Sequence, residues 1–225
     1  MREAALNIAT WDGMYASGRS LLAWPDEQVV AALARRRASI RRGLDLACGA
    51  GRHALLMARM GIDALGIDSS PAAIAHATRR AWDEGLAARV RFEQGLAQDL
   101  ALPDAHFDAA ICWGLLHYLG AADRAGVLGS LQRLVRPGGV LIATLRSERD
   151  SRAREGVAES DGARRVGYFD VETRSPRETR MFFWSEAEAR ELLAGWSQVS
   201  LGHRSIEPVG KLGAATCHWL VEARR

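Results

Sequence analysis

The chain has 225 residues, 48% of them hydrophobic, and a formal net charge of +3 at pH 7, which suits one large domain with an ample core. No apolar run approaches the ~20 residues of a membrane span, the first residues lack a secretory signal, and three widely spaced cysteines fit neither a disulfide framework nor a metal site, so we expect a cytoplasmic protein without a metal. Arginine carries nearly all of the positive charge without forming a basic block, so we expect no nucleic acid and no membrane as partner, while composition leaves the oligomeric state unknown.

Helix-like and strand-like patterns alternate as far as residue 145. Pro25, Gly61 and Ser70 mark helix ends, because proline and serine favour the first turn and glycine favours the last. The predicted helices cover residues 24–42, 52–60, 70–84 and a segment around 128–135, and the predicted strands cover residues 44–47, 64–67, 89–93, 108–113 and, after the turn Pro137-Gly138-Gly139, 140–145. Such alternation is typical of a doubly wound α/β sheet.

The alternation stops after residue 145. Residues 146–168 are charged and rich in glycine with little periodicity, so we expect a mobile loop or a small lid there. Ser185 and Glu188 form a capping-box pattern for a helix that runs to about residue 194. The last two predicted strands have only a loop between them and should pair antiparallel; they cover residues 198–202 and 215–222.

The most informative stretch is Leu-Asp-Leu-Ala-Cys-Gly-Ala-Gly-Arg at residues 44–52. A strand stops at Gly49 and Gly51, where glycine allows positive φ and lets a ligand approach without meeting a Cβ. Asp68 ends the next strand, 19 residues after Gly49, and a carboxylate at that offset reaches both hydroxyls of a bound ribose. We therefore predict a nucleoside-containing cofactor at the carboxyl end of a parallel sheet.

The same bend fits Gly-x-Gly-x-x-Ala through Ala54, which leaves a nicotinamide-dependent dehydrogenase open. Asp45 favours a different ligand. A charge inside a strand must be paired or hydrogen-bonded, and Asp45 can reach the glycine turn and, directly or through water, a ligand's ammonium group. A dinucleotide has no ammonium and offers its pyrophosphate to the helix N-terminus instead.

Five motifs within residues 40–145 resemble the class I S-adenosylmethionine-dependent methyltransferases. They are the stretch at 44–51, Gly66-Ile67-Asp68-Ser69-Ser70, the segment from Gly95 to Leu102, Phe107-Asp108, and Leu134-Val135-Arg136-Pro137-Gly138-Gly139. The antiparallel last strands match this family and not a dehydrogenase. The resemblance implies a doubly wound, Rossmann-like, seven-stranded, mostly parallel sheet with an antiparallel last strand, and S-adenosylmethionine as the cofactor.

The resemblance also implies contacts at the methionyl end of the cofactor. Ala47 and Gly49 would offer backbone carbonyls to the methionyl ammonium, at a bend that Gly51 completes. Cys112 and Trp113, at the end of the fourth strand, would line the same side.

At the nucleoside end, the resemblance implies that Asp68 binds the ribose hydroxyls and Ser69 packs beside the adenine. The family usually has an acid after the glycine of its third motif, and this chain has Leu96 instead. Adenine recognition would then rest on the backbone of Leu96 and Ala97, or on the side chain of Gln98 or Asp99.

Trp11, Tyr15 and Arg19 are spaced four residues apart near the N-terminus. They form either one face of a helix packed on the core or a lid over the cofactor. As a lid, the aromatic faces would attract the sulfonium cation, and Arg19 would pair with the methionyl carboxylate.

His117 follows the fourth strand, where the methyl acceptor should approach. Histidine is the usual general base near neutral pH, but the same residue can simply cap a turn. Holding a nucleophile in line with the activated methyl group supplies most of the catalysis, so the family often needs no strong base. His203 and His218, on the last two strands, are further residues that could touch an acceptor.

Taken together, the sequence predicts one methyltransferase domain over residues 1–225. Its parts are an N-terminal helical lid (1–42), a cofactor-binding core (43–145), a cap or insert (146–184), and a C-terminal helix with an antiparallel strand pair (185–225). We expect in-line methyl transfer to a small-molecule nucleophile, with S-adenosylhomocysteine as the product. The alternatives are an NAD-dependent dehydrogenase and a non-catalytic S-adenosylmethionine-binding module.

Overall fold

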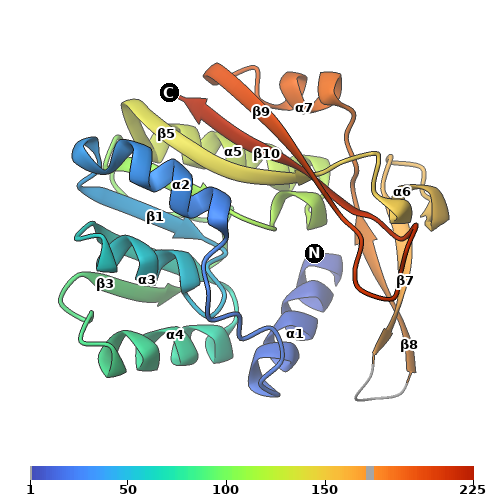
Figure 1. Ribbon diagram of the computed structural model, residues 1–225, viewed down its shortest axis with the longest axis horizontal. Helices are drawn as coiled ribbons and strands as arrows, with labels where there is room; N and C mark the ends of the chain where they lie inside the picture. The colour runs from blue at the N-terminus through green and yellow to red at the C-terminus, as the bar shows by residue number, and fades with distance from the viewer. Residues whose placement is uncertain (1, 171–174) are drawn as a thin grey trace.

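The computed structural model of the protein describes residues 2–170 and 175–225. Within them a seven-stranded sheet has the order β3-β2-β1-β4-β5-β10-β9 (Figure 1). Strands β1 to β5 pair in parallel, and β10 pairs antiparallel with both β5 and β9. The strands are β1 (Arg42–Leu46), β2 (Asp63–Asp68), β3 (Val90–Gln94), β4 (Phe107–Cys112), β5 (Val135–Arg146), β9 (Ser197–Ile206) and β10 (Thr216–Arg224). The predicted doubly wound sheet with its antiparallel last strand is confirmed.

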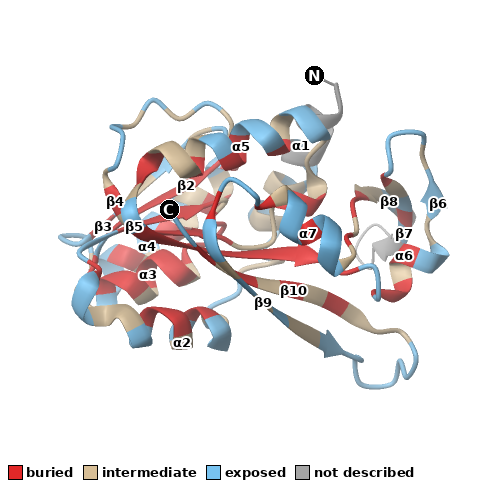
Figure 2. Ribbon diagram, turned by 90° about the horizontal axis from the view of Figure 1, so that it is seen from above, coloured by how far each residue is buried: buried red, intermediate tan, exposed pale blue. Residues whose placement is uncertain are grey.

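Helices cover both faces of the sheet, and successive strand residues alternate between two cores (Figure 2). Leu44 and Leu46 of β1 join the core under α5 and α7, whereas Ala109 and Ile111 of β4 join the core under α2 and α3. The helices are α1 (Arg2–Ala16), α2 (Glu27–Arg36), α3 (Arg52–Arg59), α4 (Pro71–Asp83), α5 (Ala121–Leu134), α6 (Ser151–Glu155) and α7 (Glu186–Leu192), with short 3-10 turns η1 (Arg37–Ser39) and η2 (Leu116–Tyr118). Among the described residues, no helix is both long enough and apolar enough to cross a bilayer.

The starts of α4 and α7 form as the sequence predicts, whereas α2 starts at Glu27, so Pro25 lies before the helix and not in its first turn. The side chains of Asp26, Ser70 and Ser185 each accept a hydrogen bond from a backbone N–H in the first turn of α2, α4 and α7. Glu188 completes the capping box before α7, and Gly61 takes a left-handed φ of 73° after α3. The helix predicted to run to residue 42 is shorter, because α2 gives way to η1.

Strand β5 begins before the predicted turn at Pro137-Gly138-Gly139, so the prediction of a helix, a turn and then a strand is wrong here. The turn is an irregularity inside the strand, where the pairing with β4 shifts register between Phe107 and Ala109. Gly138 has a φ of 78°, and its N–H donates to the Arg225 carbonyl at 2.9 Å. A distant segment thus supplies the partner that keeps this stretch in the sheet.

The predicted cap or insert (146–184) contains a second sheet, which begins inside residues 146–168, the part predicted to be a mobile loop or a small lid. Strands β6 (Val157–Ala158), β7 (Arg164–Asp170) and β8 (Ser175–Met181) pair antiparallel after α6. Its charges obscure the strand pattern: Arg165 and Arg180 face one another across β7 and β8, and Glu159 pairs with both. Residues 171–174 of the predicted insert and residue 1 of the predicted lid lie outside the described residues.

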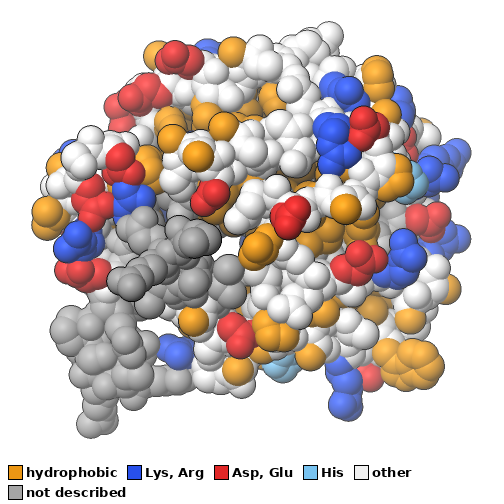
Figure 3. Space-filling view, turned by 180° about the vertical axis from the view of Figure 1, so that it is seen from behind, with side chains coloured by type: hydrophobic (Ala, Val, Ile, Leu, Met, Phe, Trp, Pro, Cys, Tyr) orange, Lys and Arg blue, Asp and Glu red, His pale blue; other side chains and the backbone are white. Residues whose placement is uncertain are grey.

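On the face seen in Figure 3, positive and negative side chains are interspersed.

Candidate functional site

A cavity of about 780 Å³ opens where the parallel strands end. Helix α1 and the hairpin β7–β8 lie beyond the carboxyl end of β1, and both contribute to its wall (Figure 1). The predicted site residues that line it are Trp11, Tyr15, Ala47, Gly49, Asp68, Ser69, Leu96, Ala97, Trp113 and His117. Those that do not are Arg19, Asp45, Gly51 and Cys112.

The bend between β1 and α3 has the backbone geometry that glycine favours. Ala47, Gly49 and Gly51 have φ values of 57°, 52° and 80°. A left-handed alanine costs roughly 1–2 kcal/mol, so surrounding contacts must hold the chain in this conformation. A Cβ on Gly49 would overlap the Tyr15 hydroxyl. Glycine at this position therefore lets α1 close directly onto the bend.

Asp68 ties this bend to the end of β2. Its carboxylate accepts the Gly49 N–H at 2.8 Å and the Ser70 N–H at 2.9 Å. Burial raises its pKa, while the hydrogen bonds from Ser70, Gly49 and Ser69 oppose that rise. Asp68 is only 9% exposed, yet it lines the cavity. A carboxylate has about four lone-pair sites, so this one keeps acceptor capacity for a ligand's hydroxyls.

Asp45, Gly51 and Cys112 lie behind the cavity wall. Asp45 is 1% exposed, and its Oδ2 accepts the Ala54 N–H at 2.9 Å in the first turn of α3. Burial raises the pKa of Asp45 to about 7. At Gly51 a Cβ would overlap Phe92, and Cys112 is fully buried. The bond that the sequence predicts from Asp45 to the glycine turn thus goes to the start of α3 instead, and these three residues support the bend from inside the protein.

Helix α1 covers the bend with two aromatic side chains. The Trp11 ring lies 6.1 Å from the Tyr15 ring and meets Tyr118 edge-on at 5.8 Å. Asp12 accepts the Ser70 hydroxyl at 2.6 Å, and a backbone N–H of α4 at 3.0 Å. The same helix that presents Trp11 and Tyr15 is therefore fixed to the start of α4.

Arg19 does not share that helix face. Helix α1 ends at Ala16, and Gly18 and Ser20 have positive φ values of 78° and 61°. The Nε of Arg19 donates to the Ser17 hydroxyl at 3.0 Å. The four-residue spacing in the sequence thus runs past the end of the helix, and the expectation that one helix carries all three residues is wrong for Arg19.

The loop after β3 forms the wall beside Ser69. Leu96, at the position where the resemblance expects an acid, is 41% exposed and lines the cavity together with Ala97. Gln98 also lines the cavity, and Asp99 does not. Of the two polar side chains considered for adenine, the structure therefore brings Gln98 to the cavity.

The opposite wall carries basic side chains that the sequence analysis largely missed. Arg146 of β5, His218 of β10 and Arg204 of β9 lie opposite one another in the strand register, and all three line the cavity. Thr144, on the same face as Arg146, accepts the Gly114 N–H at 2.9 Å. Arg146 directly follows a predicted strand, so the rule that ligands meet strand ends could have found it.

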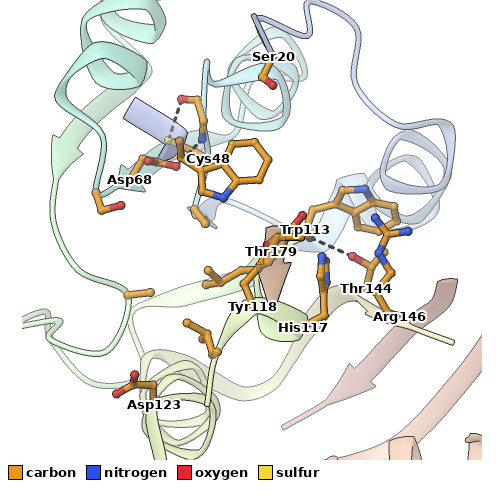
Figure 4. Close-up of a pocket in the computed structure, with 18 of the residues that line it drawn as sticks. Ser20, Cys48, Asp68, Trp113, His117, Tyr118, Asp123, Thr144, Arg146 and Thr179 are labelled. Carbon is orange, nitrogen blue, oxygen red and sulfur yellow. Dashed lines mark hydrogen bonds between the residues drawn. The ribbon is translucent and has the colours of Figure 1, made fainter. Parts of the chain in front are cut away.

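Figure 4 shows the two sides of the pocket. His117, Thr144 and Arg146 gather on one side, and Cys48 and Asp68 lie on the other. His203, by contrast, does not line the cavity and hydrogen-bonds with the Ser147 hydroxyl at 3.1 Å.

The histidines of the cavity are neutral near pH 7. Burial, helped by Arg146, holds the pKa of His117 well below its usual value and lowers that of His218 to about 3. Burial also lowers the pKa of His53 to about 3, and its Nε2 accepts the Asp26 N–H at 3.2 Å. Among residues 2–170 and 175–225, no three His, Cys, Asp or Glu side chains gather as a metal ion would require.

The comparisons with known proteins point to one family. Residues 44–139 match the model of a methyltransferase domain. The demethylmenaquinone methyltransferase of Thermus thermophilus is 39% identical over 105 residues, 45% of this chain and 46% of the relative. The ubiquinone biosynthesis O-methyltransferase of Alkalilimnicola ehrlichii is 38% identical over 107 residues, 47% of this chain and 42% of the relative. The chain thus spans less than half the length of these two relatives.

A solved structure shares the whole fold. The 1,6-didemethyltoxoflavin-N1-methyltransferase of Burkholderia thailandensis, with bound 1,6-didemethyltoxoflavin and S-adenosylhomocysteine, matches with a TM-score of 0.67. The match covers 99% of this chain and 88% of that one at 22% identity, which shows the fold alone.

Proposed function

We propose that the chain, whose residues 44–139 match the model of a methyltransferase domain, is a class I S-adenosylmethionine-dependent methyltransferase that transfers a methyl group to a small-molecule nucleophile. The observation that carries this proposal is the placement of Asp68. Its buried carboxylate joins the ends of β1 and β2 and faces a cavity of about 780 Å³, within the range of small-molecule sites.

The residues of the cavity fit this cofactor. Asp68 has acceptor capacity for the ribose hydroxyls, and the bend at Ala47 and Gly49 brings backbone close to the methionyl end. The faces of Trp11 and Tyr15 can attract a sulfonium cation. The residues proposed for the adenine end are Ser69, Leu96 and Ala97.

When bound, S-adenosylmethionine supplies a methyl group activated by a positively charged sulfur. The chain's own contribution is mainly position. Thr144 accepts the Gly114 N–H and so holds the loop that carries Trp113. His117 is neutral and can accept a proton from an acceptor, but its lowered pKa makes it a weak base. Helix α1, which covers the bend, limits the access of water.

The geometry of Asp45 favours this function over an NAD-dependent dehydrogenase. Its carboxylate accepts the Ala54 N–H in the first turn of α3. A dinucleotide places its pyrophosphate at such a helix start and needs those N–H donors. An anion there would also meet the buried Asp45 group.

Calorimetry with S-adenosylhomocysteine and with NAD tests the cofactor. We expect binding of S-adenosylhomocysteine and no heat from NAD; the reverse result would support the dehydrogenase. Incubation with methyl-labelled S-adenosylmethionine and fractionated host metabolites, followed by mass spectrometry, then tests the transfer. Binding of S-adenosylhomocysteine without any labelled product would instead indicate a non-catalytic binding module.

A further inference from the structure

Three basic side chains stand in a row across three neighbouring strands of the cavity wall. His218 is directly opposite Arg146 on one side and Arg204 on the other. Cross-strand neighbours point to the same face of a sheet, so the row is a single continuous surface. His117, on η2, adds a second imidazole, with its ring centroid 6.5 Å from that of His218.

Buried nitrogens in this wall lack hydrogen-bond partners among the described residues. They are Nε of Arg146, Nε of Arg204 and Nδ1 of His117. Arg146 is 9% exposed and His117 2% exposed, so both side chains are deeply buried, and both line the cavity. An unpaired buried polar atom costs about 1–3 kcal/mol. A ligand in the cavity is the partner that the fold itself does not supply.

The same wall has more guanidinium groups than carboxylates. Asp150, fully buried, is shared by Arg146 at 3.0 Å and Arg152 at 2.9 Å. Arg204, on β9, pairs with Asp26 at 2.8 Å, and the charge of Asp26 also acts on Arg52. Each of these two carboxylates therefore faces two arginines, which leaves an excess of positive charge. The two histidines are neutral and do not change this balance. The wall is suited to an anion.

We propose that Arg146 and Arg204, together with His117, bind a carboxylate group of the methyl acceptor, so that the substrate is a small carboxylic acid with an apolar body. The inference rests on the proposed function and names its substrate class. A carboxylate is an acceptor-only group, and its charge-assisted bonds to guanidinium are about twice as strong as neutral ones. Trp113 and Leu115, also in the cavity wall, offer apolar surface for the rest of the acceptor.

The methionyl carboxylate of the cofactor is the competing anion. The bend that would hold the methionyl group lies at the end of β1, and β4 separates β1 from β5. With ~4.8 Å between strands, Arg146 lies about 10 Å along the sheet from that bend. Arg204 is nearer to it than its strand position suggests, because its partner Asp26 also donates its N–H to His53 in the first turn of α3. Arg146 thus lies two strands away from the bend, toward the space left for the acceptor, and Arg146→Met is the variant that separates the two anions.

The test is a panel of acids paired with their uncharged amides, titrated by calorimetry into the protein saturated with S-adenosylhomocysteine. The pairs are benzoate and benzamide, 4-hydroxybenzoate and 4-hydroxybenzamide, cinnamate and cinnamamide, and octanoate and octanamide. We expect at least one acid to bind at least about tenfold more tightly than its amide, a difference of about 1.4 kcal/mol. Arg146→Met and Arg204→Met should each reduce that preference to within twofold.

Arg149→Met is the matched control, because Arg149 is exposed and does not line the cavity; it should keep the full preference. If Arg146→Met does not fold, the double variant Arg146→Met/Asp150→Asn, which preserves the net charge, is measured in place of the single variant. Equal binding of acids and amides across the panel would overturn the proposal while leaving the methyltransferase function standing.

The affinity for S-adenosylhomocysteine separates the remaining outcomes. An unchanged affinity in Arg146→Met supports an acceptor site. A tenfold loss in that variant would overturn the proposal and assign the wall to the cofactor's own carboxylate. If the wild-type protein does not bind S-adenosylhomocysteine, the proposed function fails, and the acceptor assignment fails with it.

Discussion

At the end of β1 the cavity wall is backbone, and at the ends of β5, β10 and β9 it is side chains. The bend of Ala47 and Gly49 and the carboxylate of Asp68 come from a short stretch of chain and are joined by one hydrogen bond. Arg146 and Arg204 come from separate elements and meet only through strand register. The first end suits a ligand common to a family, because it depends on few side chains. The second suits a ligand particular to this chain.

Asp68→Asn should have the largest effect on the cofactor end. It keeps the shape of the side chain but removes the charge, and it sets an amide N–H₂ against Gly49 N–H or Ser70 N–H. Bonds to a charged group contribute about 1.5–3 kcal/mol each, so we expect the affinity for S-adenosylhomocysteine to fall about 100-fold in calorimetry. Asp63→Asn, at the exposed opposite end of β2, is the control and should change it less than twofold. If Arg146→Met lowered the affinity for S-adenosylhomocysteine as much as Asp68→Asn does, the cofactor end and the basic wall of the cavity would not be separate sites.

The sequence predicts the cofactor end of the cavity well and the basic wall poorly, because the first is local in the chain and the second is not. The bend, Asp68 and the helix caps depend on residues close together in the chain, so local patterns predict them. The basic wall does not, because nothing in the sequence states that residue 218 pairs with both 146 and 204. The second sheet was missed for a related reason: Arg165 and Arg180 look like solvated charges until Glu159 is placed between them.

The N-terminal residues show the limit of local spacing. Trp11 and Tyr15 face the cavity, whereas the residue four positions further does not, because Gly18 and Ser20 turn the chain after α1. A four-residue spacing predicts one face only while the helix lasts, and the Ser17-Gly18 pair was the signal that it ends.

Trp11→Ala should have an intermediate effect that depends on the charge of the ligand. A cation near an aromatic face gains about 0.5–2 kcal/mol. We therefore expect about a tenfold loss of affinity for S-adenosylmethionine, whose sulfur is charged, and a smaller loss for S-adenosylhomocysteine, whose sulfur is neutral. Arg19→Ala should change neither affinity by more than twofold. Equal losses for both ligands in Trp11→Ala would reduce the tryptophan to a packing role, and a large loss in Arg19→Ala would restore its predicted pairing with the methionyl carboxylate.

Asp45→Asn should have the smallest effect on binding and a clear effect on stability. The carboxyl accepts the Ala54 N–H from behind the wall, a bond that an amide oxygen can also accept, so the affinity for S-adenosylhomocysteine should stay within twofold. Burial raises the pKa of Asp45 from 3.8 to about 7. Below pH 3.8 the folded and unfolded chains both hold this proton. Between pH 3.8 and about 7 the unfolded chain releases it while the folded chain retains it, so the contribution of this group to the free energy of unfolding falls as pH rises.

The substitution removes that pH dependence. Relative to the wild type, Asp45→Asn should therefore gain about 4 kcal/mol in the free energy of unfolding between pH 4 and pH 8. Urea unfolding of both proteins at the two pH values measures the difference. If the difference does not change with pH, the carboxyl is already ionised in the folded protein and must have a cationic partner. If the affinity for S-adenosylhomocysteine instead falls tenfold, the Asp45 carboxylate pairs with the ammonium group of the bound ligand, and the cofactor end of the cavity depends on a buried side-chain charge as well as on backbone.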